Sequence, residues 1–311
     1  MKYIYGPVPS RRLGYSLGID PIPPKTCNYQ CIYCQLGKTT NFTNSRKNYY
    51  PKNDIIAEME QILKLNDNEI DYITFVGSGE PTLYKDLEEL ILKAKELSKK
   101  PVCVITNGSL LFQEDVQSSL MYSDLVIPSF DAGDEKLFKK INRPHPSINF
   151  TNLIQGLINF KEIFEGQFWV EVMIMEGIND SKEELFKIKR NLDLINPDKI
   201  DINVPIRPPV EDWVKIPNVS IISILDEVFE DYSNINYPEK GKFSIHSTNF
   251  EKELLAILER HPMRHNQIIE TFSSSIFNKE RIISELENLS TKKKIKKIIY
   301  NEQIFWKIHI D

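Results

Sequence analysis

The sequence predicts an α/β fold built on a parallel sheet, with a smaller unit at its C-terminal end. Short runs rich in β-branched and apolar residues alternate with amphipathic helical segments over the first two thirds of the chain. This alternation is typical of parallel strands joined by crossover helices. The chain has 311 residues, 41% of them hydrophobic, which is enough for one large domain and a small one. A polar segment containing Pro238 and Gly241 separates the two parts.

The expected strands and helices follow one another in order along the chain. Strands are expected at 16–19, 72–76, 102–105, 125–127, 168–175 and 199–204. Helical spacing of apolar residues predicts helices at 54–65, at 85–97, in stretches through Leu137 and Leu153 to Phe160, and at 182–194. We therefore expect a large domain over residues 1–231, made of six strand–helix units, and a linker over 232–248.

Residues 249–311 are expected to form the second domain. Helices are predicted at 249–260, 265–271 and 278–289, and a hairpin at 294–300 and 303–309. Three helices followed by a hairpin resemble a winged helix-turn-helix domain, a fold that often places its third helix in the major groove of DNA. Here that helix carries both signs of charge, which argues against tight duplex binding: Lys279, Glu280, Arg281, Glu285 and Glu287.

Three of the four cysteines lie within eight residues, in the pattern Cys-x3-Cys-x2-Cys formed by Cys27, Cys31 and Cys34. Four cysteine thiolates normally hold a [4Fe–4S] cluster, so three of them leave one iron open for a ligand that is not protein. A structural zinc site would need a fourth ligand, and disulfide pairing would leave one cysteine of the trio over. Cys103 lies in an apolar run and is expected to be a buried strand residue.

The cysteine motif resembles that of the radical SAM superfamily. The resemblance implies a partial (β/α)6 barrel and two cofactors, a [4Fe–4S] cluster and S-adenosylmethionine (SAM). In that superfamily the open iron binds the amino and carboxylate groups of SAM. Cleavage of SAM then gives methionine and a 5′-deoxyadenosyl radical, which abstracts a hydrogen atom from the substrate. The resemblance also implies an active site at the C-terminal ends of the strands.

The loops that follow the strands carry a second part of the resemblance, which covers roughly residues 1–210. The segment 77–82 resembles a motif that binds the SAM amino group, and 129–131 lies where members of the superfamily bind the SAM ribose and carboxylate. Tyr33 lies where an aromatic ring packs on the adenine. Taken alone, 77–82 and 106–108 also read as ordinary turns. The residues implied to bind SAM are Tyr33, Ser78, Gly79, Glu80, Asn107, Ser129 and Asp131.

Three further stretches, 5–14, 24–26 and 140–145, resemble the tRNA wyosine synthase-like branch of the superfamily, which joins a carbon fragment to a methylated guanine. Wyosine synthases carry additional upstream cysteines for a second cluster. No cysteine precedes Cys27 in this sequence, so a second cluster cannot form in the same way. The resemblance favours an RNA substrate, in particular tRNA. Modification of a peptide or protein, including activation of a glycyl-radical partner, and a redox-sensing transcription regulator are the alternatives.

Basic residues supply the candidate substrate contacts. Arg11, Arg12 and Arg143 are expected either at the mouth of the barrel or in surface salt bridges. Lys292, Lys293 and Lys294 are expected either to contact phosphates or to form a solvated edge. The formal net charge of −5 gives no global basic field, although residues 249–311 carry 11 basic and 9 acidic residues.

The sequence also bears on location and partners. Polar residues and prolines follow the first five residues, so no signal peptide is expected, and no apolar run is long enough to predict a membrane span. Thiolates persist in a reducing cytoplasm, which is the expected compartment. The implied chemistry requires an electron donor such as a flavodoxin or ferredoxin.

Overall fold

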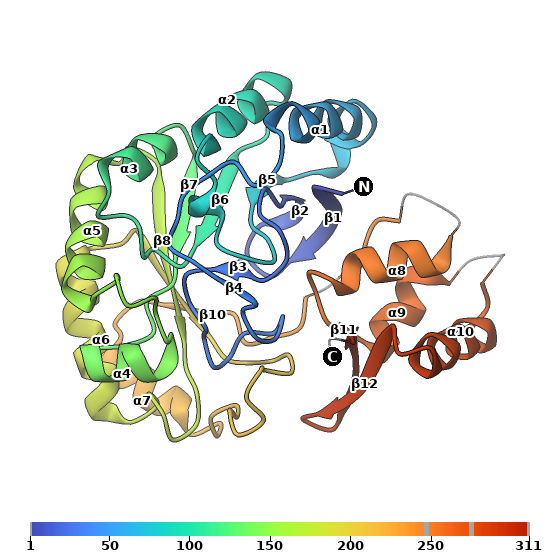
Figure 1. The fold of residues 1–311 in the computed structure, drawn as a ribbon. Coiled ribbons are helices and arrows are strands. Elements are labelled where there is room, and N and C mark those ends of the chain that lie inside the picture. The colour runs from blue at the N-terminus through green and yellow to red at the C-terminus, as the bar shows by residue number, and fades with distance from the viewer. Residues whose placement is uncertain (1, 240, 246–248, 274–276, 310–311) are drawn as a thin grey trace.

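The computed structural model describes residues 2–239, 241–245, 249–273 and 277–309 (Figure 1). Within them, one eight-stranded sheet has the order β1-β2-β5-β6-β7-β8-β9-β10. Its strands are β1 (Ile4–Ser10), β2 (Gly14–Ile19), β5 (Tyr72–Phe75), β6 (Val102–Thr106), β7 (Leu125–Pro128), β8 (Gln167–Met173), β9 (Lys199–Asn203) and β10 (Ser233–Asn234). Each neighbouring pair from β2 to β10 is parallel, whereas β1 pairs antiparallel with β2. The six strands predicted from the sequence are β2 and β5 to β9, so the parallel sheet is confirmed.

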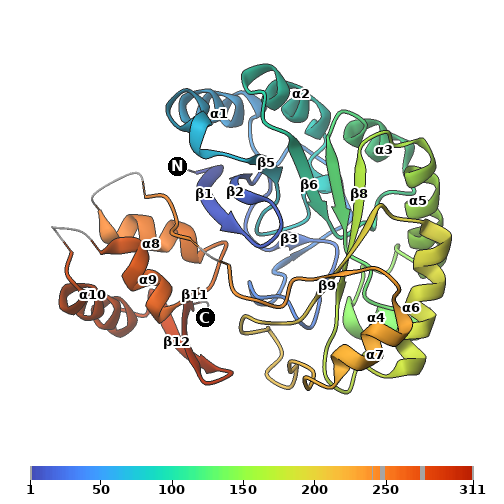
Figure 2. The same ribbon diagram turned by 180° about the vertical axis from the view of Figure 1, so that it is seen from behind.

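Helices cover the outer face of this curved sheet, as the two ribbon views show (Figures 1 and 2). They are α1 (Lys52–Asn66), α2 (Leu87–Leu97), α3 (Glu114–Leu120), α4 (Glu135–Ile141), α5 (Phe150–Ile163), α6 (Lys182–Ile195) and α7 (Ile221–Val228), with 3-10 turns η1 (Asp67–Glu69) and η2 (Pro81–Leu83). The sequence did not predict α3, α7 or β1. Pro7 and Pro9 make the β1 segment read as irregular, but proline is tolerated in an edge strand because one side of that strand needs no donors.

Apolar side chains fill both faces of the parallel sheet. Every residue of β7 is buried, and a continuous core joins the strands to the helices. On the inner face a smaller cluster contains Leu13, Cys103, Leu125 and Ile127. Leu13 comes from the turn between β1 and β2, so this turn helps to fill the barrel interior. Cys103 is fully buried on β6, as the sequence predicted.

The C-terminal elements have an apolar core of their own. They are α8 (Phe250–Leu258), β11 (Met263–Arg264), α9 (His265–Phe272), α10 (Lys279–Thr291), β12 (Ile295–Tyr300) and β13 (Gln303–Ile308). The three strands pair in the order β11-β13-β12. Buried residues including Leu254, Ile282, Leu286 and Trp306 form a cluster separate from that of the barrel. The three predicted helices and the predicted hairpin are therefore found, and they lie beside the β1–β2 edge of the large sheet (Figures 1 and 2).

In the part of the chain that the structure describes, no helix combines the length and the apolar character needed to cross a bilayer.

Candidate active site

The three clustered cysteines lie on a loop that begins at the short strand β3 (Thr26–Cys27), which pairs with β4 (Asn41–Phe42). Backbone hydrogen bonds join this loop to the end of α4. The amide of Gln30 donates to the carbonyl of Asn142 (3.0 Å), the amide of Ile32 donates to Ile141 (2.9 Å), and the amide of His145 donates to Asn28 (2.8 Å). Segment 140–145 therefore supports the cysteine loop, which accounts structurally for one of the stretches singled out in the sequence.

All three thiols are free, and two of them accept side-chain amide hydrogen bonds. Asn107 Nδ2 lies 3.8 Å from the Sγ of Cys27, and Asn142 Nδ2 lies 3.6 Å from the Sγ of Cys31. Burial raises the pKa of Cys27 to about 12, and the nearby charge of Glu80 adds to the shift. Burial likewise raises the pKa of Cys31. These thiols therefore keep their protons until a metal displaces them, and the amide donors are placed to stabilise the thiolates that result.

The residues present fit a cluster better than a single metal ion. Among the described residues, no three His, Cys, Asp or Glu side chains gather around one point as ligands of one ion. A cubane cluster makes a different demand, because each cysteine binds a different iron. Cys103 cannot complete a four-cysteine site, since it lies in the inner apolar cluster on β6. The zinc alternative is therefore not supported.

Glu80 is buried in the loop after β5, at the N-terminal cap of η2. Its Oε1 accepts hydrogen bonds from the amide and hydroxyl of Thr82 (3.0 and 2.6 Å) and from the hydroxyl of Thr106 (2.6 Å). Its Oε2 accepts one bond, from the amide of Asn107 (2.7 Å). Burial raises the pKa of Glu80, while these donors oppose the shift. The carboxylate is held in one orientation, and Oε2 keeps capacity for a further donor.

Gly79 allows this loop to pass directly against the cysteine loop. A Cβ atom at this position would lie 2.0 Å from the carbonyl oxygen of Thr26. That same carbonyl accepts the amide of Glu80 at 3.1 Å. The absence of a side chain at Gly79 therefore sets Glu80 beside the start of the cysteine motif.

Tyr33 and Asp131 form a second link between the cysteine loop and the strands. The Tyr33 hydroxyl donates to Asp131 Oδ2 at 2.6 Å, and Asn142 Nδ2 donates to the same oxygen at 2.8 Å. The amide of Met173, at the end of β8, donates to Asp131 Oδ1 at 2.9 Å. Asp131 is thus buried and bonded to three other parts of the site, namely the cysteine loop, the end of α4 and the end of β8. Ser129, two residues earlier, joins the same edge through a backbone bridge to Glu171.

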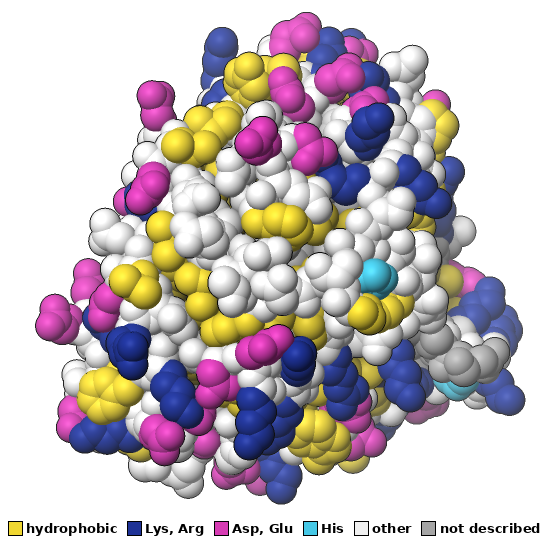
Figure 3. Space-filling view, turned by 60° about the vertical axis from the view of Figure 1, so that its left-hand side comes forward, with side chains coloured by type: hydrophobic (Ala, Val, Ile, Leu, Met, Phe, Trp, Pro, Cys, Tyr) yellow, Lys and Arg dark blue, Asp and Glu magenta, His cyan; other side chains and the backbone are white. Residues whose placement is uncertain are grey.

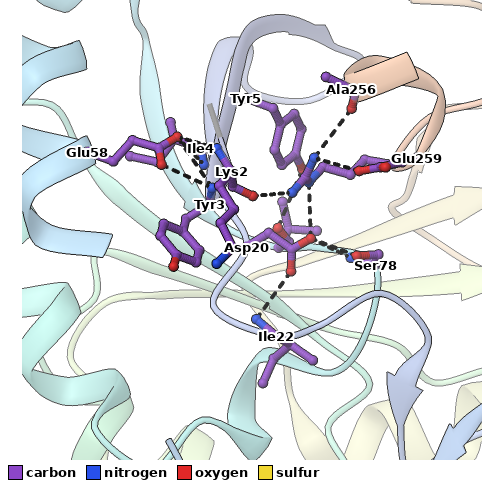
Figure 4. A network of polar contacts seen from close by, with 12 residues as sticks. Lys2, Tyr3, Ile4, Tyr5, Asp20, Ile22, Glu58, Ser78, Ala256 and Glu259 are labelled. Carbon is purple, nitrogen blue, oxygen red and sulfur yellow. Dashed lines mark hydrogen bonds and ion pairs between the residues drawn. The ribbon is translucent and has the colours of Figure 1, made fainter. Parts of the chain in front are cut away.

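The Ser78 side chain is directed toward Asp20, while its carbonyl accepts the amide of Lys25 at 2.8 Å. Its amide and hydroxyl donate to Asp20 Oδ2 at 3.1 and 2.7 Å. The guanidinium of Arg260, which follows α8, forms an ion pair with the same carboxylate at 3.1 Å and donates to the carbonyl of Lys2 at 2.8 Å. Figure 4 shows this network, in which the N-terminal strand, the loop after β5 and the C-terminal elements meet. This contact could not be predicted from sequence patterns, because Asp20 and Arg260 are 240 residues apart.

The arginines named from the sequence are each engaged by the protein. Arg12 forms an ion pair with Glu171 on β8. Arg11 donates to Asn203 Oδ1 at 2.7 Å and to the carbonyl of Ile235. Arg143 pairs with Glu211 and, together with Cys31, lines a cavity of 340 Å³. Arg143 is therefore the one of these three that borders the cysteine loop.

The lysines at 292–294 lie where α10 turns into β12, apart from the cysteine loop. All three are exposed, and Lys294 pairs with Glu251. The site residues that sequence reasoning missed are Asn28 and Asn142. Asn28 accepts a hydrogen bond from Asn107 Nδ2 at 2.7 Å. Both asparagines lie in stretches that the sequence marked, but nothing in the pattern distinguished them from neighbouring polar residues.

Comparison with known proteins bears on this arrangement. The sequence-family model of the radical SAM superfamily matches residues 22–188, from the loop before the cysteines into α6. A UPF0026 protein of Methanocaldococcus jannaschii is 38% identical over 98% of this chain and 96% of its own length. A protein of Brachyspira hyodysenteriae named GTPase Obg is 40% identical over 99% of this chain, which spans only 45% of that protein.

Among solved structures, SuiB of Streptococcus suis bound to the precursor peptide SuiA has a TM-score of 0.52 and 17% identity, covering 68% of this chain and 45% of that chain. At this identity the likeness concerns the fold. The match to the superfamily model covers more than half of the chain and includes all three clustered cysteines. The superfamily predicted from the sequence is thereby confirmed, and with it the two cofactors that the superfamily uses. The chain belongs to the radical SAM superfamily of enzymes and, within it, to the UPF0026 proteins.

Proposed function

We propose that the chain abstracts a hydrogen atom from an RNA substrate, in particular tRNA, with a [4Fe–4S] cluster held by Cys27, Cys31 and Cys34. One observation carries the cluster and its site: the free thiols lie on one loop that is bonded to the loops after β5 and β7 and to the end of α4. When bound, the cluster supplies the electron that cleaves SAM to methionine and a 5′-deoxyadenosyl radical. An electron donor such as a flavodoxin or ferredoxin would reduce it.

The neighbouring residues would bind and orient SAM. Glu80 is held by its donors with Oε2 able to accept another hydrogen bond, so it suits the ammonium group of SAM. Asn107 and Asp131 lie on the two loops that flank the cysteines, where they suit the polar groups of the ligand. Tyr33 offers its ring to the adenine. Ser78, Gly79 and Ser129 shape the backbone around this space.

The C-terminal elements favour an RNA substrate through their order. Helix, strand, two helices and a hairpin follow one another from α8 to β13, and this is the order of a winged helix domain over residues 249–311. The segment expected as the linker, 232–248, also contributes β10 to the large sheet. Such domains commonly bind nucleic acid, and the exposed lysines at 292–294 would contact phosphates there. The helix-covered face in Figure 3 carries interspersed basic and acidic side chains. This face therefore has no extended positive potential that would attract RNA.

A peptide substrate is the second candidate. SuiB, which shares the radical SAM fold with this chain, was solved in complex with a precursor peptide. A protein substrate would use the same cluster and SAM site, so the two candidates differ only in the class of substrate bound at the mouth of the barrel.

Stimulation of SAM cleavage by substrate tests this proposal. The reconstituted chain is given dithionite and SAM, and 5′-deoxyadenosine is measured with no addition, with total tRNA, with the same tRNA after nuclease digestion, and with a peptide mixture. We expect intact tRNA alone to raise the rate. Stimulation by peptides and not by tRNA would replace the RNA proposal with the peptide candidate. A fully loaded protein that cleaves no SAM under any condition would favour a redox-sensing regulator.

A further inference from the structure

A cavity of 650 Å³ lies between the cysteine loop and the C-terminal hairpin. One wall comes from residues 24–25, 35–38 and 40, and the opposite wall from the end of α8 and from β12 and β13. A cavity of this size suits a small molecule or one unit of a larger one. It therefore lies where the barrel and the C-terminal elements could hold a ligand together.

The cavity is basic. Four lysines line it, Lys25, Lys38, Lys296 and Lys307, against a single acidic residue, Glu259. Within the described part of the chain, none of the four forms an ion pair. Lys294, by contrast, is paired with Glu251, although not every other lysine of the hairpin region has an acidic partner among the described residues.

Lys25 is the most constrained of the four. It is 9% exposed, and its Nζ has no hydrogen-bond partner among the described residues. A buried ammonium group without a partner is costly. An anion bound in the cavity would offset part of this cost.

Lys296 and Lys307, on the opposite wall of the cavity, are further evidence for an anion site. They stand directly across from each other on β12 and β13. Like charges directly opposite in an antiparallel pair destabilise the sheet. Both side chains line the cavity and are only partly exposed, so an anion between them would relieve the repulsion.

The cavity also connects with the candidate active site. Gly37, Lys38 and Val210 line both this cavity and the smaller one that Cys31 and Arg143 border. A ligand held by the lysines could therefore extend from the hairpin toward the cysteine loop.

We propose that this cavity binds a phosphate group of the substrate between Lys38, Lys296 and Lys307, with Lys25 adding its charge from the wall. A phosphate ester is favoured over a single carboxylate because four cations face one acidic residue, and a phosphate supplies more charge and more acceptor oxygens. The inference rests on the proposed function, for which it names the chemistry that recognises the substrate.

Binding of small phosphate esters tests the inference on the full, cluster-loaded chain. Uridine 5′-monophosphate, uridine and a single-stranded RNA oligonucleotide are titrated into wild type and into Lys296→Gln/Lys307→Gln. We expect the monophosphate to bind more tightly than uridine, and the double variant to lose about 10-fold or more in affinity for it. Lys297→Gln is the matched control, because Lys297 adjoins Lys296 on the same strand but lines a different cavity with His265 and Trp306.

The outcomes separate the possible sources of the phosphate. If the double variant binds both the monophosphate and the oligonucleotide more weakly, the site accepts any phosphate ester. If it binds only the oligonucleotide more weakly, the site recognises a phosphate within an RNA chain. Both support the inference. Equal affinities in wild type and the double variant would overturn it, as would an equal loss in Lys297→Gln.

Two further measurements separate phosphate binding from a role of Lys25 at the cluster, and separate this inference from the proposed function. Weaker monophosphate binding in Lys25→Gln supports the site, whereas loss of iron with unchanged monophosphate affinity would mean that Lys25 serves the cluster instead. The same wild-type preparation is assayed for 5′-deoxyadenosine. Cleavage of SAM without any phosphate binding refutes this inference alone, and phosphate binding without cleavage refutes the proposed function alone.

Discussion

Removing the charge of Arg260 should destabilise the chain more than any exposed arginine would. The Arg260 and Asp20 side chains are 8% and 1% exposed, and their ion pair measures 3.1 Å. Breaking a buried pair by removing one partner costs about 3–5 kcal/mol, because the other charge is left uncompensated. Ser78 still donates two hydrogen bonds to Asp20, so we expect Arg260→Met to lie near the lower end, about 3 kcal/mol.

The assay is urea unfolding of Arg260→Met, with Arg190→Met as the matched control. Arg190 is exposed on α6, and its replacement should change the free energy of unfolding by less than about 0.5 kcal/mol. In the double variant Asp20→Asn/Arg260→Met no buried charge is left unpaired, so it should recover part of the loss. Equal stability of the two single variants would refute the reasoning, since it would mean that the network in Figure 4 contributes nothing to the fold.

Three other predictions concern the site, the pH dependence and the hairpin. Glu80→Gln should weaken SAM binding about 10-fold or more while iron content stays at the wild-type level; unchanged SAM affinity by equilibrium dialysis would remove Glu80 from the cofactor site. Burial, with the charge of Arg207, lowers the pKa of His261 from 6.5 to about 3. The unfolded chain therefore binds a proton below pH 6.5 that the native state does not, and the free energy of unfolding should fall by up to about 1.4 kcal/mol per pH unit between pH 6 and 4. His261→Asn should flatten that slope, and an identical slope would contradict the assignment. Replacing the lysines at 292–294 with Ala should weaken RNA binding and reduce the log–log salt slope by up to about 3 units; equal slopes would mean that these lysines are a solvated edge.

The parts of the fold that follow local patterns were accessible from the sequence. Strands β5 to β9 are short apolar runs, and α1, α2 and α6 have regular apolar spacing, so period and length suffice to predict them. The hairpin of β12 and β13 turns at Asn301 and Glu302, both of which adopt positive φ. Local sequence patterns therefore predicted most of the strands and helices and their order along the chain.

The contacts that build the site were mostly inaccessible, because they join residues that are far apart in sequence. Asn142 reaches Cys31 across 111 residues, and Asn107 reaches Cys27 across 80. The cluster of lysines at 292–297 was recognised in the sequence, but neighbouring residues of a strand point to opposite faces, so its members lie on different surfaces. Lys296 lines the cavity beside the cysteine loop, while Lys297 lines another cavity. Composition cannot assign these two faces, since that depends on the register of the hairpin.

Iron content and SAM cleavage, measured together on one anaerobic preparation, test the central claim most directly. The account predicts about four irons per chain in the wild type, with 5′-deoxyadenosine and methionine formed after addition of dithionite and SAM. Cys31→Ala should lose both the iron and the cleavage, and Cys103→Ala should keep both, because Cys103 lies in the inner apolar cluster. Zinc in place of iron, or four irons retained in Cys31→Ala, would contradict the account.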